Sequence, residues 1–159
     1  MVLLLVRHAH AGDRDKWVGD DSQRPLTPKG QRQATGLAAL LAPFAIDRIM
    51  SSPYARCMQT VEPLAESLGL RVDAAEALGE GHRAAGLALV DLDSDDVVVL
   101  CGHGDTVPYM LLALTGRGAF DDMRCEKAST WVVRTATEIT LEYLPPPSSG
   151  GGEGAKSLV

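Results

Sequence analysis

Short aliphatic runs alternate with amphipathic stretches along most of the chain. Nearly continuous runs of Val and Leu, typical of strands buried on both faces of a sheet, occupy residues 2–6 and 96–101. Weaker strand patterns occupy residues 46–50 and 71–75, and helices are predicted over residues 31–41, 54–68 and 106–114. An antiparallel hairpin is predicted from residues 129–135 and 138–144. This alternation predicts a three-layer α/β/α sandwich with a mostly parallel central sheet.

Several element boundaries carry capping or helix-breaking residues. Thr27 is placed to cap the first predicted helix, with Pro28 in its first turn. Gly69 is placed to end the second helix. Pro63 lies inside that second helix, and we expect it to kink or split the helix, because proline lacks the amide hydrogen that a helix interior uses.

Three stretches show no clear periodicity. Residues 8–24 are polar and rich in Asp and Gly, which indicates a long loop, and residues 78–92 indicate a loop followed by a short helix. Residues 145–159 combine prolines, glycines and serines without apolar spacing, so a disordered tail is predicted there. The predicted domain therefore spans residues 1–144.

Composition and charge exclude several classes of protein. The 15 basic and 21 acidic side chains give a net charge of −6, which argues against nucleic acid or anionic membrane as a partner. No apolar run approaches the roughly 20 residues that span a bilayer, and the first strand lacks the features of a signal peptide. Three widely spaced cysteines, Cys57, Cys101 and Cys125, fit reduced thiols, so a cytoplasmic location is expected.

Positively charged and imidazole side chains follow three predicted strands at their carboxyl ends. Arg7 and His8 follow the first strand, Arg56 lies shortly after the second, and His103 lies between two glycines after the strand at 96–101. The carboxyl ends of parallel strands meet at one edge of a sheet, so these side chains are expected to lie together. Arginine binds phosphate oxygens in a bidentate manner. The sequence therefore predicts a phosphate site with a histidine at its centre.

The same segments resemble the signatures of a known family. Arg7-His8-Ala9 resembles the Arg-His-Gly signature of the histidine phosphatase superfamily, which includes the cofactor-dependent phosphoglycerate mutases. The segment SSPYARCMQT at residues 51–60 and Gly102-His103-Gly104 are similar to two further motifs of that family. The segment RPLTPKG at residues 24–30 resembles the small phosphohistidine-phosphatase branch and phosphatase domains joined to Nudix hydrolases. The resemblance covers residues 1–144 and implies a phosphoglycerate mutase-like fold.

This resemblance implies a role for each matching residue. His8 would be the nucleophile that accepts the phosphoryl group, Arg7 and Arg56 would clamp the phosphate oxygens, and His103 would face the same phosphate. His8 must be unprotonated to attack, and we expect the neighbouring positive charges to disfavour its protonation. The positive side chains take the place of a metal ion in this scheme, so neither a metal nor another cofactor is expected.

The sequence leaves two assignments open: which residue is the general acid, and whether a further arginine binds the phosphate. The family takes its acid from a Leu-x-Glu context, which Glu80 matches, while Glu76 competes from four residues upstream. Glu80 could instead be a solvated loop carboxylate. Arg24 is a candidate ligand of the substrate, or it forms a surface ion pair with Asp20 or Asp21.

The remaining candidates have mostly structural interpretations. His10 is one residue out of phase with the nucleophile, and its side chain is expected to point elsewhere; a metal site with His8 and Asp13 is the alternative. His82 is expected at the pocket rim or in solvent. Trp17 could stack on a nucleobase or a protein side chain, or could anchor its loop against the domain.

Two features favour hydrolysis over a mutase reaction. Residues 11–13 lack the asparagine that mutase-like members carry after the first motif, although Ala9 in place of glycine is a small change. Glu80 and His103 are only 23 positions apart, too few for a substantial lid, and an open site lets water reach the phosphoenzyme.

Three functions follow from this site. The first is a metal-independent phosphatase that works through a phosphohistidine intermediate on a protein phosphohistidine or another small phosphorylated substrate. The second is a nucleotide or small phosphoester phosphatase, and the third is a catalytically silent phosphate-binding domain. We expect no fused Nudix partner on this chain, because residue 1 opens directly onto the first strand and the predicted tail is short.

Overall fold

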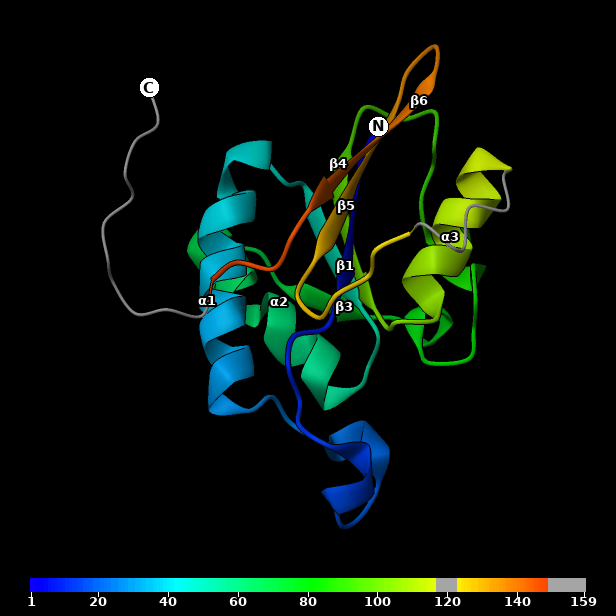
Figure 1. Ribbon diagram of the computed structural model, residues 1–159. Coiled ribbons are helices and arrows are strands. Elements are labelled where there is room, and N and C mark those ends of the chain that lie inside the picture. Colours follow the sequence, from blue (N-terminus) through cyan, green and yellow to red (C-terminus); the bar gives the residue numbers. More distant parts are fainter. Residues whose placement is uncertain (117–122, 149–159) are drawn as a thin grey trace.

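A six-stranded mixed sheet forms the centre of the molecule (Figure 1). The computed structural model describes residues 1–116 and 123–148. The strands are β1 (Val2–Arg7), β2 (Arg48–Ser51), β3 (Val72–Ala74), β4 (Val97–Gly102), β5 (Thr130–Thr135) and β6 (Ile139–Leu144). Their order in the sheet is β3-β2-β4-β1-β5-β6. Strands β1, β2, β3 and β4 run parallel to one another. Strand β5 is antiparallel to β1, and β5 and β6 form the predicted antiparallel hairpin.

Three α-helices cover the two faces of this sheet (Figure 1). They are α1 (Pro28–Leu41), α2 (Ala55–Leu68) and α3 (Thr106–Thr115). Side chains alternate along β1: Leu4 and Val6 pack with α1 and α2, whereas Leu3 and Leu5 pack with α3. Each face of the sheet thus has its own apolar core, and the predicted three-layer sandwich with a mostly parallel sheet is confirmed.

The boundaries of the helices follow the capping residues in the sequence. The Thr27 side chain accepts a hydrogen bond from the Gly30 amide at the start of α1, and Gly69 ends α2 with φ of 66°. Pro63 does not split the helix, so that prediction is wrong: α2 continues through this residue without interruption. Val61 and Leu64 are fully buried beside Pro63, so packing holds the helix together on both sides of it.

The aperiodic stretches contain only short 3-10 helices. Residues 8–24 include those at Arg14–Lys16 and Asp21–Gln23, and residues 78–92 include the predicted short helix, a 3-10 helix at Ala85–Leu89. Residues 145–148 form no regular element, and Pro147 lies against Gly36 of α1. The rest of the predicted tail, 149–159, lies outside the described residues. No described helix is long and apolar enough to cross a membrane.

The topology brings the three chemistry-bearing segments to one edge of the sheet. Strand β4 lies between β1 and β2, and all three are parallel. Backbone hydrogen bonds continue just past the strand ends, since the His8 amide donates to the Gly102 carbonyl at 3.0 Å and the Ser52 amide to the Cys101 carbonyl at 2.9 Å. The segments after the three strands are therefore fixed next to one another.

Candidate active site

His8 directly follows β1 and is only 6% exposed. Its Nδ1 lies 2.8 Å from the carbonyl oxygen of Ala9. A carbonyl oxygen only accepts hydrogen bonds, so Nδ1 carries the hydrogen and Nε2 of the neutral ring has a free lone pair. This is the tautomer that a nucleophilic histidine needs.

The environment of His8 strongly favours the neutral ring. Burial lowers its pKa to about 3, and the positive charges of Arg56, His103 and Arg7 act in the same direction, while the hydrogen bond to the Ala9 carbonyl opposes them. The sequence predicts this effect from positive neighbours alone. Burial is the larger cause, and the neighbours add to it.

His103 faces His8 across the edge of the sheet. The two rings meet edge to face with their centroids 5.6 Å apart. Nε2 of His103 lies 2.9 Å from the Ser52 hydroxyl, and its backbone amide donates to the Thr106 hydroxyl at 2.8 Å. The ring is thus held both by the serine motif after β2 and by the first turn of α3. The structure brings together the two histidines that the sequence singled out.

Arg7 is the last residue of β1 and directly precedes His8. One of its terminal nitrogens donates to the Cys125 carbonyl at 2.5 Å, and its buried Nε has no partner among the described residues. The guanidinium packs directly on Gly104: a Cβ built at Gly104 would lie 2.8 to 3.0 Å from three of its atoms. The second glycine of the Gly102-His103-Gly104 motif therefore provides space for Arg7.

Arg56 is completely buried in the first turn of α2. Its terminal nitrogens donate to the Asp21 carbonyl at 2.8 Å and to the Asp21 carboxylate at 3.1 Å. The second of these nitrogens also lies 3.7 Å from the Glu80 carboxylate, and the guanidinium sits over the ring of Tyr54. Asp21 therefore fixes the orientation of a charge that the fold buries.

Arg24 combines both alternatives that the sequence left open. It pairs with Asp21, its Nε lying 2.9 Å from the carboxylate, yet it is buried and lines the pocket at His8. It also donates to the carbonyl oxygens of Ala11 and Gly12 at 2.9 and 3.2 Å. The pair with Asp21 is thus part of the pocket wall.

Glu80, and not Glu76, lies at this site. Glu80 lines the pocket and accepts a hydrogen bond from Arg14 at 2.5 Å. The amide of the next residue, Gly81, donates to the carboxylate of Asp105 at 2.7 Å, which ties the loop of Glu80 to the turn after His103. Glu76 is exposed and is not among the residues that line the pocket.

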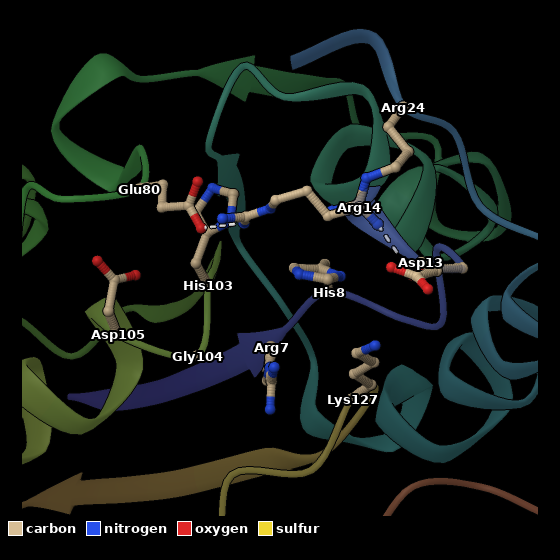
Figure 2. A pocket seen from close by; sticks show the side chains of 11 residues that line it. Arg7, His8, Asp13, Arg14, Arg24, Glu80, His103, Gly104, Asp105 and Lys127 are labelled. Carbon is tan, nitrogen blue, oxygen red and sulfur yellow. Dashed lines mark hydrogen bonds and ion pairs between the residues drawn. The ribbon is translucent and has the colours of Figure 1, made fainter. Parts of the chain in front are cut away.

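Most of the side chains described above surround a pocket of about 580 Å³ (Figure 2), but the buried Arg56 and its partner Asp21 are not part of its lining. It is lined by Arg7, His8, Gly12, Asp13, Arg14, Arg24, Glu80, His103, Gly104, Asp105 and Lys127. Four of these residues are not predicted from the sequence: Gly12, Arg14, Asp105 and Lys127. All four lie in loops or turns, where no periodicity indicates the direction of a side chain. Of these four residues, Asp105 alone could have been suspected from the sequence, because it directly follows the second histidine motif.

The other residues weighed from the sequence lie away from the nucleophile. Nδ1 of His10 is 2.7 Å from the Thr27 hydroxyl, so this ring points toward α1. His82 is exposed and outside the pocket lining. Trp17 is 37% exposed and donates to the Asp20 carbonyl, which holds it within its own loop. Among the described residues, no group of three His, Cys, Asp or Glu side chains is arranged to hold a metal ion.

Comparison with known proteins identifies the family. The sequence pattern of the histidine phosphatase superfamily (branch 1) matches residues 3–87. The chain belongs to this superfamily, whose phosphatases are hydrolases. The family pattern ends before His103, so the position of that histidine in the site comes from the fold.

Particular relatives extend over most of the chain. The 8-oxo-(d)GTP phosphatase of Mycolicibacterium smegmatis is 32% identical over an alignment of 155 residues, and the match covers 91% of this chain and 48% of that protein. The chain thus spans about half the length of this curated relative.

Solved structures match nearly end to end. The proposed phosphohistidine phosphatase SixA from Agrobacterium tumefaciens is 25% identical, with a TM-score of 0.73, over 91% of this chain and 97% of that one. The SixA protein from Nakamurella multipartitia is 26% identical, also with a TM-score of 0.73, over 91% and 95% of the two chains. The phosphoglycerate mutase-like fold is confirmed by these neighbours.

Proposed function

We propose that this protein is a phosphatase that passes the phosphoryl group of its substrate through Nε2 of His8. The observation that carries this proposal is the state of His8: a buried, neutral ring, with Nδ1 held by the Ala9 carbonyl and Nε2 left as the nucleophile. Arg7 and His103 line the same pocket, and Arg56 lies buried behind Glu80. In this proposal, these groups stabilise charge on the phosphoryl oxygens during transfer.

The proposed reaction has two steps. The Nε2 lone pair of His8 attacks phosphorus, and the bond from phosphorus to the leaving group breaks. Where the leaving atom is an oxygen, Glu80 gives it a proton. Water then attacks the phosphohistidine, Glu80 takes a proton from that water, and the P–N bond breaks. Inorganic phosphate leaves, and His8 and Glu80 return to their starting states. All the positive charge in this scheme comes from side chains.

Protein phosphohistidine is the substrate that we propose first. The SixA-like neighbours, similar over nearly their whole length, support it. The pocket supports it as well, because every described residue that lines it is polar, charged or glycine. Such a wall suits a phosphoryl group and has no apolar side chain for a nucleobase to pack against. Glu80 is also engaged by Arg14, and a protonated imidazole leaving group needs no proton from an acid.

A nucleotide is the second candidate substrate. It is supported by the 32% identity to an 8-oxo-(d)GTP phosphatase over 91% of this chain. In this case the base would lie outside the polar pocket, and Glu80 would have to protonate an oxygen leaving group. The two substrates therefore make different demands on Glu80.

One experiment tests the reaction and separates the substrates. Phosphate release is measured from a phosphohistidine protein and from a panel of nucleoside phosphates, with EDTA present, for the wild type, His8→Ala and His82→Ala. We expect the wild type and His82→Ala to form an acid-labile phosphoenzyme, and His8→Ala to form none. Activity retained in His8→Ala would refute the proposal. A higher kcat/KM with a nucleoside phosphate would favour the second substrate, and no phosphoenzyme with any donor would favour a silent binding domain.

A further inference from the structure

A turn before β5 is bonded directly to the backbone of Arg7 and His8. The amide of Ala128 lies 3.1 Å from both the Arg7 and the His8 carbonyl oxygens, and the Arg7 amide donates to the Ser129 carbonyl at 3.1 Å. The Cys125 carbonyl holds the Arg7 side chain as described above. This turn is therefore positioned by the same residues that would bind and accept the phosphoryl group.

The backbone of this turn adopts a conformation that is unfavourable for its sequence. Ala128 has φ of 66° and is fully buried. Left-handed backbone is uncommon for residues other than glycine, and it persists where the surrounding structure fixes it. Here the shared hydrogen bonds to Arg7 and His8 fix it. The residue before Ala128 is Lys127, which lines the pocket.

Lys127 differs from the arginines of the pocket in having no hydrogen-bond or ion-pair partner within residues 1–116 and 123–148. The three arginines that line the pocket each donate a hydrogen bond to another residue of the protein: Arg7 to Cys125, Arg14 to Glu80 and Arg24 to Asp21. The ammonium group of Lys127 forms neither a hydrogen bond nor an ion pair with any residue that the structure describes. It is thus available to a ligand without breaking a contact.

The surroundings of Lys127 disfavour the charged form of its ammonium group. Burial lowers its pKa, and the positive charges of Arg7, Arg24 and Arg56 lower it further. A bound phosphate would reverse both effects by supplying opposite charge and hydrogen-bond acceptors. Figure 2 shows Lys127 and Glu80 on opposite sides of His8. The lysine can therefore act on a bound phosphate without pairing with the acid.

We propose that Lys127 is a ligand of the phosphate group that reacts with His8. The ammonium group would bind phosphoryl oxygens on the side of His8 away from Glu80, next to Arg7. This assignment rests on the proposed function for the identity of the reacting group, but the binding that it predicts can be measured without turnover.

The test measures binding of inorganic phosphate to the full chain by titration calorimetry. Lys127→Met removes the charge and keeps much of the aliphatic length, and Lys29→Met removes the same charge from an exposed lysine outside the pocket lining. We expect Lys127→Met to weaken phosphate binding about tenfold, and Lys29→Met to change it by less than about twofold. Lys127→Arg, which keeps the positive charge, should recover part of the affinity.

The outcomes separate this assignment from the proposed function. Equal phosphate affinity in the wild type and in folded Lys127→Met would overturn the role of Lys127, as would an equal loss in Lys29→Met. A wild type that binds phosphate through Lys127 but forms no phosphoenzyme from any donor would overturn the phosphatase proposal and leave the binding role intact. Circular dichroism and the thermal midpoint establish that each variant is folded.

Discussion

At the residue scale, Asp21 organises the positive charge of the site. Its carboxylate lies 2.9 Å from Arg24, 3.1 Å from Arg56 and 3.7 Å from Arg14. Partial burial tends to raise its pKa, but the hydrogen bond from Arg24 and the three positive charges hold that pKa below its usual value. Asp21 therefore stays ionised and pairs with two arginines of its own loop and with one arginine of α2.

Replacing Asp21 tests whether it positions Arg56 or competes with phosphate for it. We expect Asp21→Asn to raise KM by roughly tenfold with a smaller change in kcat, because Arg56 loses the anion that orients it. Asp20→Asn is the matched control: Asp20 is exposed, and its side chain accepts a hydrogen bond from the Ser22 amide. A lower KM in Asp21→Asn would mean that the carboxylate competes with substrate, which contradicts the positioning role.

Gly104 provides a second test at this scale. An added methyl group would lie 2.8 Å from the central carbon of the Arg7 guanidinium, which is the movable end of a flexible side chain. We expect Gly104→Ala to displace Arg7 and to lower kcat/KM by roughly 10- to 100-fold, while the thermal midpoint changes little. In an Arg7→Ala background the same substitution should cost no further activity. An equal loss in both backgrounds would show that Gly104 acts independently of Arg7.

At the scale of elements, local patterns predicted the strands, the helices and the hairpin, but not the two loops that complete the site. Strand β1 and the helix cap at Thr27 are determined by residues close in the sequence, so periodicity and residue type were sufficient to predict them. The pair between Arg14 and Glu80 joins residues 66 positions apart. Its formation depends on how two aperiodic loops fold over the sheet edge, and no local pattern contains that information. At Pro63, tertiary packing outweighed the tendency of proline to break a helix.

Thr27 links the start of α1 to the loop that follows His8. Its hydroxyl accepts from the Gly30 amide at 3.1 Å and lies 2.7 Å from Nδ1 of His10. We expect Thr27→Ala to lower the free energy of unfolding by about 1–2 kcal/mol, since both the helix cap and the contact to the loop are lost. Thr27→Ser, which keeps the hydroxyl, should retain most of that stability. Urea denaturation measures both, and equal losses would assign the effect to the methyl group.

At the scale of the whole molecule, net charge and site charge have opposite signs. The chain carries −6, yet three arginines, one lysine and two histidines line a single pocket. The three acidic residues of the lining, Asp13, Glu80 and Asp105, only partly offset them. The net charge thus argues against extended polyanions as partners, while the fold concentrates positive charge where one phosphate would bind. Burying His8 among these cations also links the site to the stability of the whole protein.

That link predicts how stability depends on pH. His8 has a pKa of about 3 in the folded protein and about 6.5 when unfolded, so below pH 6.5 the unfolded chain binds a proton that the folded chain does not. The stability associated with neutral His8 is fully present above pH 6.5 and is lost as the pH falls toward 3. One proton corresponds to a slope of at most about 1.4 kcal/mol per pH unit.

Substituting His8 should remove its share of this slope. We expect the free energy of unfolding of the wild type to fall between pH 7 and 5.5, above the range where most carboxylates titrate, and His8→Asn to show a slope smaller by roughly 1 kcal/mol per pH unit near the lower end. His10, whose pKa burial also lowers, contributes with the same sign and remains in both proteins. The exposed His82→Asn serves as the control. An unchanged slope in His8→Asn, measured by urea denaturation at each pH, would contradict a neutral, buried nucleophile.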